Sequence, residues 1–123
     1  MTMTGRTQHE AAEQEALFEW AEWVTGKIPD VDLLYHIPNG GSRHPKEAAS
    51  LKRQGVKAGV PDLCLPAPRG EFHGLYIEMK AGKNKPTDLQ EKWIERLRGN
   101  GYQVEVCYSW QEASRVIMRY LKL

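Results

Sequence analysis

The chain has 123 residues, with 17 Lys and Arg against 16 Asp and Glu and 41% hydrophobic residues, which is the make-up of one ordinary globular domain. A domain of this size buries enough apolar surface to fold without disulfides or a structural metal. No apolar run approaches the roughly 20 residues that cross a bilayer, and the amino terminus is polar where a signal peptide would be apolar. We therefore expect a single cytoplasmic domain over residues 1–123, flexible over residues 1–7.

Charge is distributed unevenly along the chain. Residues 1–35 contain seven acidic and two basic side chains, whereas residues 36–58 contain five basic side chains and one acidic one. A basic segment of this kind could attract a polyanion, and the alternative is a pair of solvated helix faces of opposite sign.

Elements in the first half of the chain follow from periodicity and turn residues. Residues 8–25 predict a helix, because one apolar stripe repeats at helical spacing through Ala16, Leu17, Trp20, Ala21 and Val24. Extending that stripe backward reaches Glu13 or Gln14 and then Glu10, so the buried face turns acidic, which is typical of a cleft. Residues 32–37 predict a short strand, residues 38–42 a loop, and residues 45–55 a short helix.

The second half of the chain alternates strands with capped helices. Residues 62–65 and 74–80 predict strands, and residues 102–108 predict a third. Thr87 with Gln90, and Ser109 with Glu112, each form a capping box that opens a helix. Cys64 and Cys107 lie in apolar runs without metal-ligand spacing, which predicts reduced core thiols. The order of elements predicts a mixed α/β domain with a small sheet flanked by helices.

The sharpest chemical feature is Pro61-Asp62, followed after fifteen residues by Glu78-Met79-Lys80. Residues i and i+2 of a strand share a face, so Glu78 and Lys80 point the same way. If the two short strands pair, Asp62 meets Glu78, and the two carboxylates could bind Mg²⁺ or Mn²⁺ with Lys80 beside them. Such a site suits phosphodiester hydrolysis by a metal-activated water. The alternative is an exposed Glu-Lys pair and a turn-forming Pro-Asp.

Several motifs, taken in order, resemble a known family. They are Glu10-x-x-x-Gln14, Ile37-Pro38-Asn39-Gly40-Gly41-Ser42-Arg43, Leu51-Lys52-x-x-Gly55-Val56-Lys57-Ala58-Gly59, Gly59-Val60-Pro61-Asp62, Glu78-x-Lys80 and Gln90-x-x-Trp93-x-x-x-Leu97. Together they resemble the PD-(D/E)XK nucleases, and more narrowly the VRR-NUC family, the virus-type replication-repair nucleases. The resemblance covers all of the chain except about the first seven residues and the last helix. It implies a restriction-endonuclease-like PD-(D/E)XK core.

The resemblance implies a role for each matching residue. Asp62 and Glu78 would bind the metal together with the Met79 carbonyl, and Lys80 would be the catalytic lysine. Glu10 would be the acid of the first helix, because its offset from Gln14 matches the family, and Glu13 is the second choice. Gln90 would act in the site, although the same side chain could instead cap its own helix.

Nucleic-acid contacts are expected from the glycine-rich loop and the basic segment. Glycines at positions 40 and 41 let backbone N–H groups approach a phosphate closely. Arg43, Lys52 and Lys57 would form a positive track along DNA. Gln14 and Asn39 are further DNA-binding candidates. The alternative is an ordinary flexible loop with solvated cations. The tryptophans fall at helix-face spacings and are predicted to serve the core or an interface rather than base stacking; they are Trp20, Trp23, Trp93 and Trp110.

The activity that the resemblance implies is Mg²⁺-dependent endonucleolytic cleavage of DNA, with Mn²⁺ able to substitute. Family members of this minimal size are similar to Holliday-junction resolvases and act as homodimers in phage or bacterial settings, so we expect branched DNA as the substrate. Two symmetric nicks also require two active sites related by a twofold axis. The alternatives are a DNA-binding or assembly module that does not cleave, and an RNA-directed nuclease.

Overall fold

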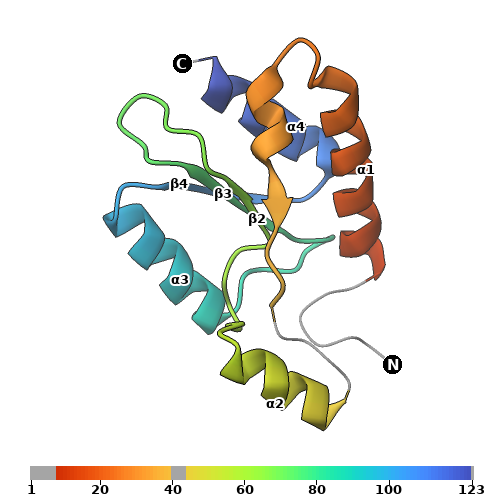
Figure 1. Ribbon diagram of the computed structural model, residues 1–123, viewed down its shortest axis with the longest axis vertical. Coiled ribbons are helices and arrows are strands. Elements are labelled where there is room, and N and C mark those ends of the chain that lie inside the picture. The colour runs from red at the N-terminus through yellow and green to blue at the C-terminus, as the bar shows by residue number, and fades with distance from the viewer. Residues whose placement is uncertain (1–7, 40–43, 123) are drawn as a thin grey trace.

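The computed structural model describes residues 8–39 and 44–122. Its elements in chain order are shown in Figure 1 and are α1 (Gln8–Val24), the 3₁₀ helix η1 (Pro29–Leu33), β1 (Tyr35–His36), α2 (Pro45–Arg53), β2 (Leu63–Leu65), β3 (Leu75–Met79), α3 (Asp88–Gly99), β4 (Gln103–Cys107) and α4 (Trp110–Leu121). The predicted mixed α/β fold with helices around a small sheet is confirmed.

The four strands form one sheet in the order β1-β2-β3-β4. The first three strands are antiparallel neighbours, whereas β3 and β4 are parallel. A parallel pair needs a crossover connection, and α3 supplies it. In the β2–β3 register Leu63 lies opposite Ile77, so Asp62, one residue before β2, comes opposite the carboxyl end of β3. The register therefore brings Asp62 to Glu78.

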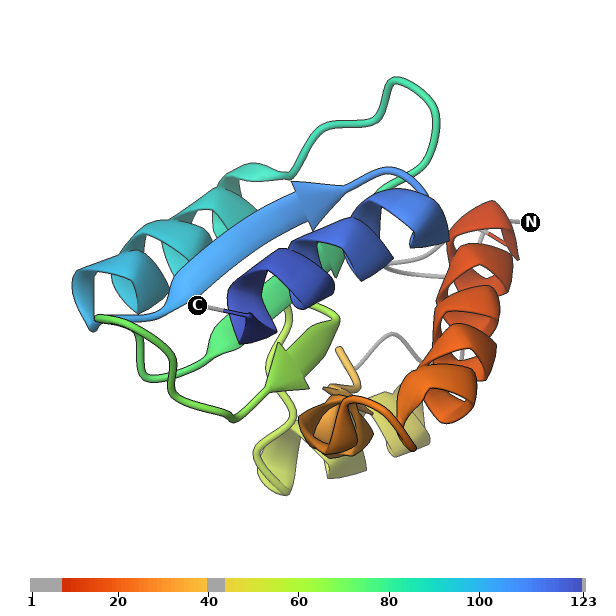
Figure 2. The ribbon, with the colours of Figure 1, turned by 90° about the horizontal axis from the view of Figure 1, so that it is seen from above.

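Helices cover both faces of the sheet, but unequally (Figure 2). The alternating residues Leu75, Ile77 and Met79 of β3 are completely buried and belong to the core formed with α1 and α4. On the other face α3 contributes a single buried residue, Ile94. Apolar burial is the dominant favourable term in folding, so the α1–α4 side carries most of the stabilisation. The α3 side is the thinner layer.

The strand predicted over residues 32–37 is wrong for most of its length. Pro29–Leu33 is a 3₁₀ helix, and only Tyr35 and His36 pair with β2. Val31 and Leu34 are buried while the intervening Asp32 and Leu33 are exposed. That three-residue spacing fits a 3₁₀ turn rather than a strand, and Pro29 suits the first helical position.

Caps define the start of the last two helices. At α3 both halves of the predicted capping box are present. The Thr87 side chain accepts a hydrogen bond from the Gln90 backbone N–H, and the Gln90 side chain accepts one from the Thr87 backbone N–H. At α4 only one half of the box is present. The Ser109 side chain accepts a hydrogen bond from the Glu112 backbone N–H. The Glu112 side chain, however, accepts one from the backbone N–H of Tyr108, one residue before the cap. The backbone N–H of Trp110, the first residue of α4, donates a hydrogen bond to Glu13 Oε1 of α1 at 2.7 Å.

Cysteines and tryptophans mostly behave as predicted. Cys64 and Cys107 are free and buried, and burial raises the pKa of both thiols. Trp20 and Trp110 pack against the core, whereas Trp23 is 91% exposed, so of the two predicted roles, core or interface, it does not have the core role. Within residues 8–39 and 44–122, none of the helices combines the length and apolarity that a bilayer crossing requires.

Candidate active site

Asp62 is held in place through both its backbone and its side chain. Its carbonyl oxygen accepts from Ile37 N–H at 2.7 Å and from His36 Nδ1 at 3.0 Å, which places a proton on Nδ1 of that ring. Its Oδ2 atom accepts from the Met79 backbone N–H at 2.7 Å. These bonds connect β1, β2 and β3, so the carboxylate is fixed where the three strands meet.

Glu78 and Lys80 project side by side from the end of β3, as the alternation predicts. Their side chains are only 3% and 8% exposed, with Lys80 Nζ 3.9 Å from Glu78 Oε2. Oε2 also accepts from Gln90 Nε2 at 3.2 Å. The other oxygen, Oε1, is buried and has no hydrogen-bond partner among the described residues. One carboxylate oxygen is therefore fixed by protein groups and the other is left with open lone pairs.

Electrostatics at Glu78 favour its neutral form in the metal-free protein. Burial, followed by the neighbouring Asp62 carboxylate, raises the pKa of Glu78 to about 9, and Glu10 acts in the same direction. The Lys80 charge lowers the pKa of Glu78, but by less than burial and the neighbouring carboxylates raise it. Two adjacent carboxylates repel when both are ionised, unless a cation lies between them. A bound cation would therefore displace the proton from Glu78.

The amide of Gln90 serves the helix cap and the site at the same time. Its Oε1 accepts from Thr87 N–H at 2.8 Å, and its Nε2 donates to Glu78 Oε2. An amide has both an acceptor and a donor end, so the two roles that the sequence set against each other are compatible. The cap fixes the side chain that contacts Glu78.

Gly59 allows α3 to approach the segment that leads into Asp62. Its φ of +92° lies in the left-handed region, and a Cβ atom there would come within 2.7 Å of Leu89 Cγ and 2.9 Å of Trp93 Cδ1. Only glycine fits both the backbone conformation and the close approach. The first turns of α3, including Gln90, therefore pack directly against the residues before Asp62.

The acidic residues of α1 lie in three different places. Glu10 is 4% exposed and contributes to the raised pKa of Glu78, so it faces the site. Glu13 instead caps α4 through Trp110. Gln14 lines a shallow hollow of about 300 Å³ together with three glutamates, which are Glu15, Glu19 and Glu22. Gln14 therefore lies on an acidic surface and not with the predicted DNA-binding cations.

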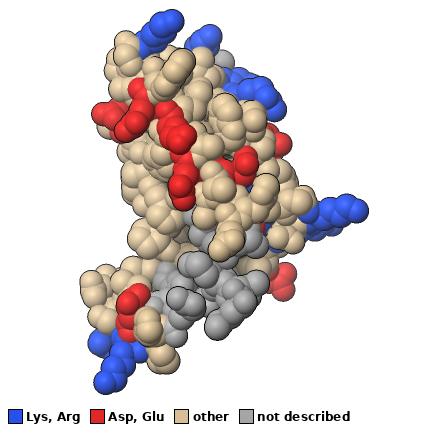
Figure 3. Space-filling model, turned by 90° about the vertical axis from the view of Figure 1, so that its right-hand side faces the viewer, with Lys and Arg blue, Asp and Glu red and all other residues tan. Residues whose placement is uncertain are grey.

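The predicted cations border a second groove. A hollow of about 540 Å³ lies between α2, the segment after it and α3, and its lining includes Asn39, Lys52, Lys57 and Leu89. α2 has no buried residue and projects from the body of the molecule. Viewed from the α1 side, carboxylates gather over the middle of the upper part, and cations lie along its edges and at the lower tip, where α2 lies (Figure 3). Arg43 lies outside the described residues.

Comparison with known proteins identifies the family. The model of the VRR-NUC domain matches residues 8–111, which is most of the chain. This protein belongs to the VRR-NUC family. A solved structure described as a VRR_NUC domain protein is 36% identical, with a TM-score of 0.73 over 90% of this chain and 88% of that one. No curated protein matches. The VRR-NUC family is a nuclease family, so the chain has a nuclease fold.

The donor set at this VRR-NUC site fits a hard divalent cation. No group of three or more His, Cys, Asp and Glu side chains within the described part of the chain is arranged to hold a metal alone. Mg²⁺ does not require such a cage, because it keeps several waters and binds through one or two carboxylates plus substrate phosphate. The unpartnered, buried Oε1 of Glu78 beside Asp62 is a suitable ligand.

Two contacts of this VRR-NUC site were missed by the sequence. The bond from His36 to the Asp62 carbonyl depends on β1 pairing with β2, and its only signal was the position of His36 just before the glycine-rich loop. The bond from the Met79 N–H to Asp62 gives Met79 a role through its amide. No local pattern could have indicated it, because the two residues are brought together only by strand register.

Proposed function

We propose that this VRR-NUC protein is a Mg²⁺-dependent endodeoxyribonuclease that also accepts Mn²⁺. The observation that carries the proposal is the buried pair of Asp62 and Glu78, which has one unpartnered oxygen and Lys80 Nζ at 3.9 Å. Burying two adjacent carboxyl groups lowers stability unless they are compensated. A structural role would favour apolar residues here, so a functional role explains the carboxylates better.

Each residue has a distinct role in the proposed reaction. Asp62 and Glu78 would hold the metal with the Met79 carbonyl, and Glu10 would be the third acid. When bound, the metal would supply an activated water and neutralise charge on the scissile phosphate. Lys80 stabilises the negative charge that develops on the phosphate oxygens. Gln90 fixes the orientation of Glu78 through the hydrogen bond to Oε2.

The proposed substrate is branched DNA, such as a Holliday junction, bound by a homodimer. Asn39, Lys52 and Lys57 border one continuous groove, and together with Arg43 they would contact phosphates. Gln14 belongs to the same proposal, although it lies on the acidic side of α1. Two identical sites related by a twofold axis would allow paired nicks in opposite strands.

A cleavage assay tests the proposal. The purified protein is incubated with a four-way junction, a flap and a plain duplex, with EDTA, Mg²⁺ or Mn²⁺. Asp62→Asn and Glu78→Gln should each lower cleavage by about three orders of magnitude, since they remove ligand charge but keep the shape of the site. Asp62→Asn also keeps an acceptor for the Met79 N–H. Asp32→Asn and Glu95→Gln, at exposed positions, are the matched controls.

The outcomes separate the alternatives. Mg²⁺-dependent cleavage by either site variant at the wild-type rate would reject the assignment of Asp62 and Glu78. Tight DNA binding without cleavage in any metal would favour a non-cleaving DNA-binding module. Preferential cleavage of an RNA substrate would favour the RNA-directed alternative. Sedimentation of the free protein as a monomer, and of its junction complex with one copy per junction, would reject the homodimer.

A further inference from the structure

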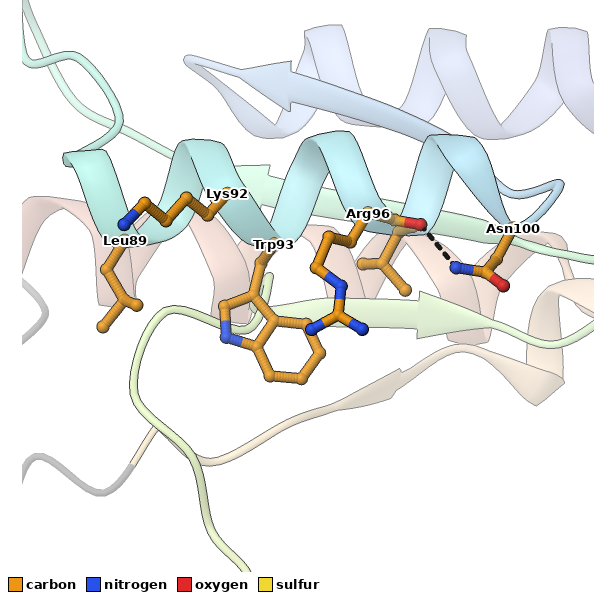
Figure 4. A pocket seen from close by; sticks show the side chains of 6 residues that line it. Leu89, Lys92, Trp93, Arg96 and Asn100 are labelled. Atoms are coloured by element: carbon orange, nitrogen blue, oxygen red, sulfur yellow. Dashed lines mark hydrogen bonds between the residues drawn. The ribbon is translucent and has the colours of Figure 1, made fainter.

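A groove runs along one side of α3. It has a volume of about 360 Å³ and is lined by five residues of that helix and the residue that caps its carboxyl end, which are Leu89, Lys92, Trp93, Arg96, Leu97 and Asn100. Figure 4 shows the indole of Trp93 projecting from the helix in the middle of the row, with the Arg96 guanidinium beside it. The volume lies within the range of ligand clefts.

The groove combines apolar surface with unneutralised positive charge. Leu89 is 48% exposed and Trp93 is only partly buried, because α3 covers its face of the sheet incompletely. Lys92 and Arg96 are four residues apart and so lie on the same side of the helix. The ion pairs among the described residues join Arg69 to Asp30 and Lys80 to Glu78. Neither cation of the groove takes part in them.

The groove adjoins both parts of the candidate site. Leu89 lines this groove and also the one that contains Asn39, Lys52 and Lys57. The next residue, Gln90, donates to Glu78. The two grooves therefore adjoin at Leu89, one residue before the side chain that contacts Glu78.

We propose that the α3 groove binds an unpaired strand of the nucleic-acid substrate, with one base stacked on Trp93 and the flanking phosphates held by Lys92 and Arg96. The proposal rests on the proposed function, since it assigns a substrate feature to the same surface. A flat aromatic ring between two cations is what single strands require, because stacking tolerates any base and the cations follow the backbone. This revises the prediction that Trp93 serves only the core or an interface.

The test measures binding of oligo(dT) in EDTA, where cleavage does not interfere. Trp93→Leu keeps an apolar side chain against Gly59 but removes the flat ring, and Trp93→Phe restores a ring. The leucine variant should bind about ten-fold more weakly or worse, in line with loss of one stacked base, without a change in the salt dependence. Trp93→Phe should recover part of the affinity. Trp23→Leu, at the exposed tryptophan of α1, is the matched control and should bind normally.

Charge removal gives an independent readout. Lys92→Ala with Arg96→Ala should reduce the slope of log affinity against log salt by about 1.4, because each lost contact with a single strand removes about 0.7. Arg115→Ala with Arg119→Ala removes the same charge from exposed positions on α4 and should leave the slope unchanged. Both cations of the groove are exposed, so this variant should fold even if Trp93→Leu does not.

Several results would overturn the proposal. One is oligo(dT) binding that is unchanged in both groove variants. Another is a groove variant that dissociates a dimer while its oligo(dT) affinity is normal, which would make the groove an interface between copies. Failure of the proposed function looks different: the wild-type protein would bind oligo(dT) through Trp93 but cleave no DNA in any metal.

Discussion

Glu78 is the residue whose surroundings most restrict its charge. Burial and the Asp62 carboxylate raise its pKa from the ordinary value of 4.5 to about 9. The folded protein therefore retains a proton that the unfolded chain releases. The stabilisation from this proton is fully present below pH 4.5 and is lost as the pH rises towards about 9.

This linkage predicts a pH dependence of stability in the metal-free protein. Between pH 6 and 8 in EDTA, the unfolding free energy of the wild-type protein should fall relative to that of Glu78→Gln, by up to about 1.4 kcal/mol per pH unit. Denaturant titration at several pH values measures the difference. Saturating Mg²⁺ should reverse the trend, since ligand carboxylates must lose their protons. Parallel curves for the two proteins would show that Glu78 is ionised throughout.

Lys80 is expected to act on the reaction more than on binding. Its ammonium group is buried beside Glu78, where a fixed charge acts in a low-dielectric setting. Lys80→Ala should lower the single-turnover rate at saturating DNA by at least about two orders of magnitude, with metal and DNA affinity within a few fold of wild type. Lys83→Ala, at an exposed position three residues later, is the control. A normal rate combined with collapsed DNA affinity would make Lys80 a phosphate clamp.

The chemistry of single residues was predictable where strand alternation determines it. Glu78 and Lys80 share a face because they are two residues apart, and Asp62 joins them because short consecutive strands pair. The dual role of Gln90 was not predictable, since the sequence contains the capping box but not the distance from α3 to Glu78. The choice between Glu10 and Glu13 likewise was not predictable, because it depends on how α4 packs against α1.

At the level of elements, the contact between α1 and α4 explains that choice. Glu13 accepts a hydrogen bond from Trp110 N–H, at the end of α4 where the helix dipole is positive. Glu10, one turn earlier, is turned to the carboxylate pair. Glu13 therefore belongs to the contact between α1 and α4, whereas Glu10, three residues earlier, faces the carboxylate pair.

These positions predict opposite phenotypes for the two glutamates. Glu13→Ala should lower the unfolding free energy by about 1.5–3 kcal/mol, the value of a hydrogen bond to a charged group, and leave the rate at saturation within a few fold. Glu10→Gln should lower that rate at least about ten-fold, as loss of a supporting ligand does. Thermal unfolding and single-turnover cleavage measure both effects. A variant Glu13→Ala that is stable but inactive would move the helix acid to Glu13.

Most elements were predictable, including the short helix α2 and the short strand β2, and the segment 29–36 was the exception. The apolar stripe of α1 and the capping box of α3 are local signals, and both helices begin and end close to the predicted residues. The segment 29–36 is too short for a periodic signal, so the three-residue spacing of Val31 and Leu34 was not distinguished from strand alternation. Only half of the predicted capping box of α4 forms, because the Glu112 carboxylate accepts a hydrogen bond from Tyr108 N–H and not from Ser109 N–H.

On the scale of the whole molecule, the acidic face of α1 and the cations of α2 lie apart. The carboxylates of α1 lie on the main body, and cations lie on the projecting α2 (Figure 3). The net charge of +1 conceals this separation. Because exposed charges act over only about 10 Å at moderate ionic strength, the α2 end can attract DNA while the α1 surface repels it. Under the proposed function, this arrangement would favour approach of DNA to the α2 groove.

The basic segment should accordingly set the salt dependence of duplex binding. Changing Arg43, Lys52 and Lys57 together to alanine should weaken binding to every DNA tested and reduce the slope of log affinity against log salt by about 2.7, since each phosphate contact accounts for about 0.9. Single-turnover cleavage at saturation should largely survive, because these cations position the DNA rather than the attacking water.

The matched control for this variant removes three exposed cations from the other end of the molecule, Arg115, Arg119 and Lys122, and should leave the slope unchanged. Separate substitution of Arg43 distinguishes its role, because a loop arginine beside two glycines could reach the scissile phosphate and would then affect the rate at saturation. An unchanged slope in the triple variant would place the positive track elsewhere, and the remaining basic side chains near the site are Lys83, Lys85 and Lys92. Lys92 lines the α3 groove, so DNA would then enter along α3 instead of α2.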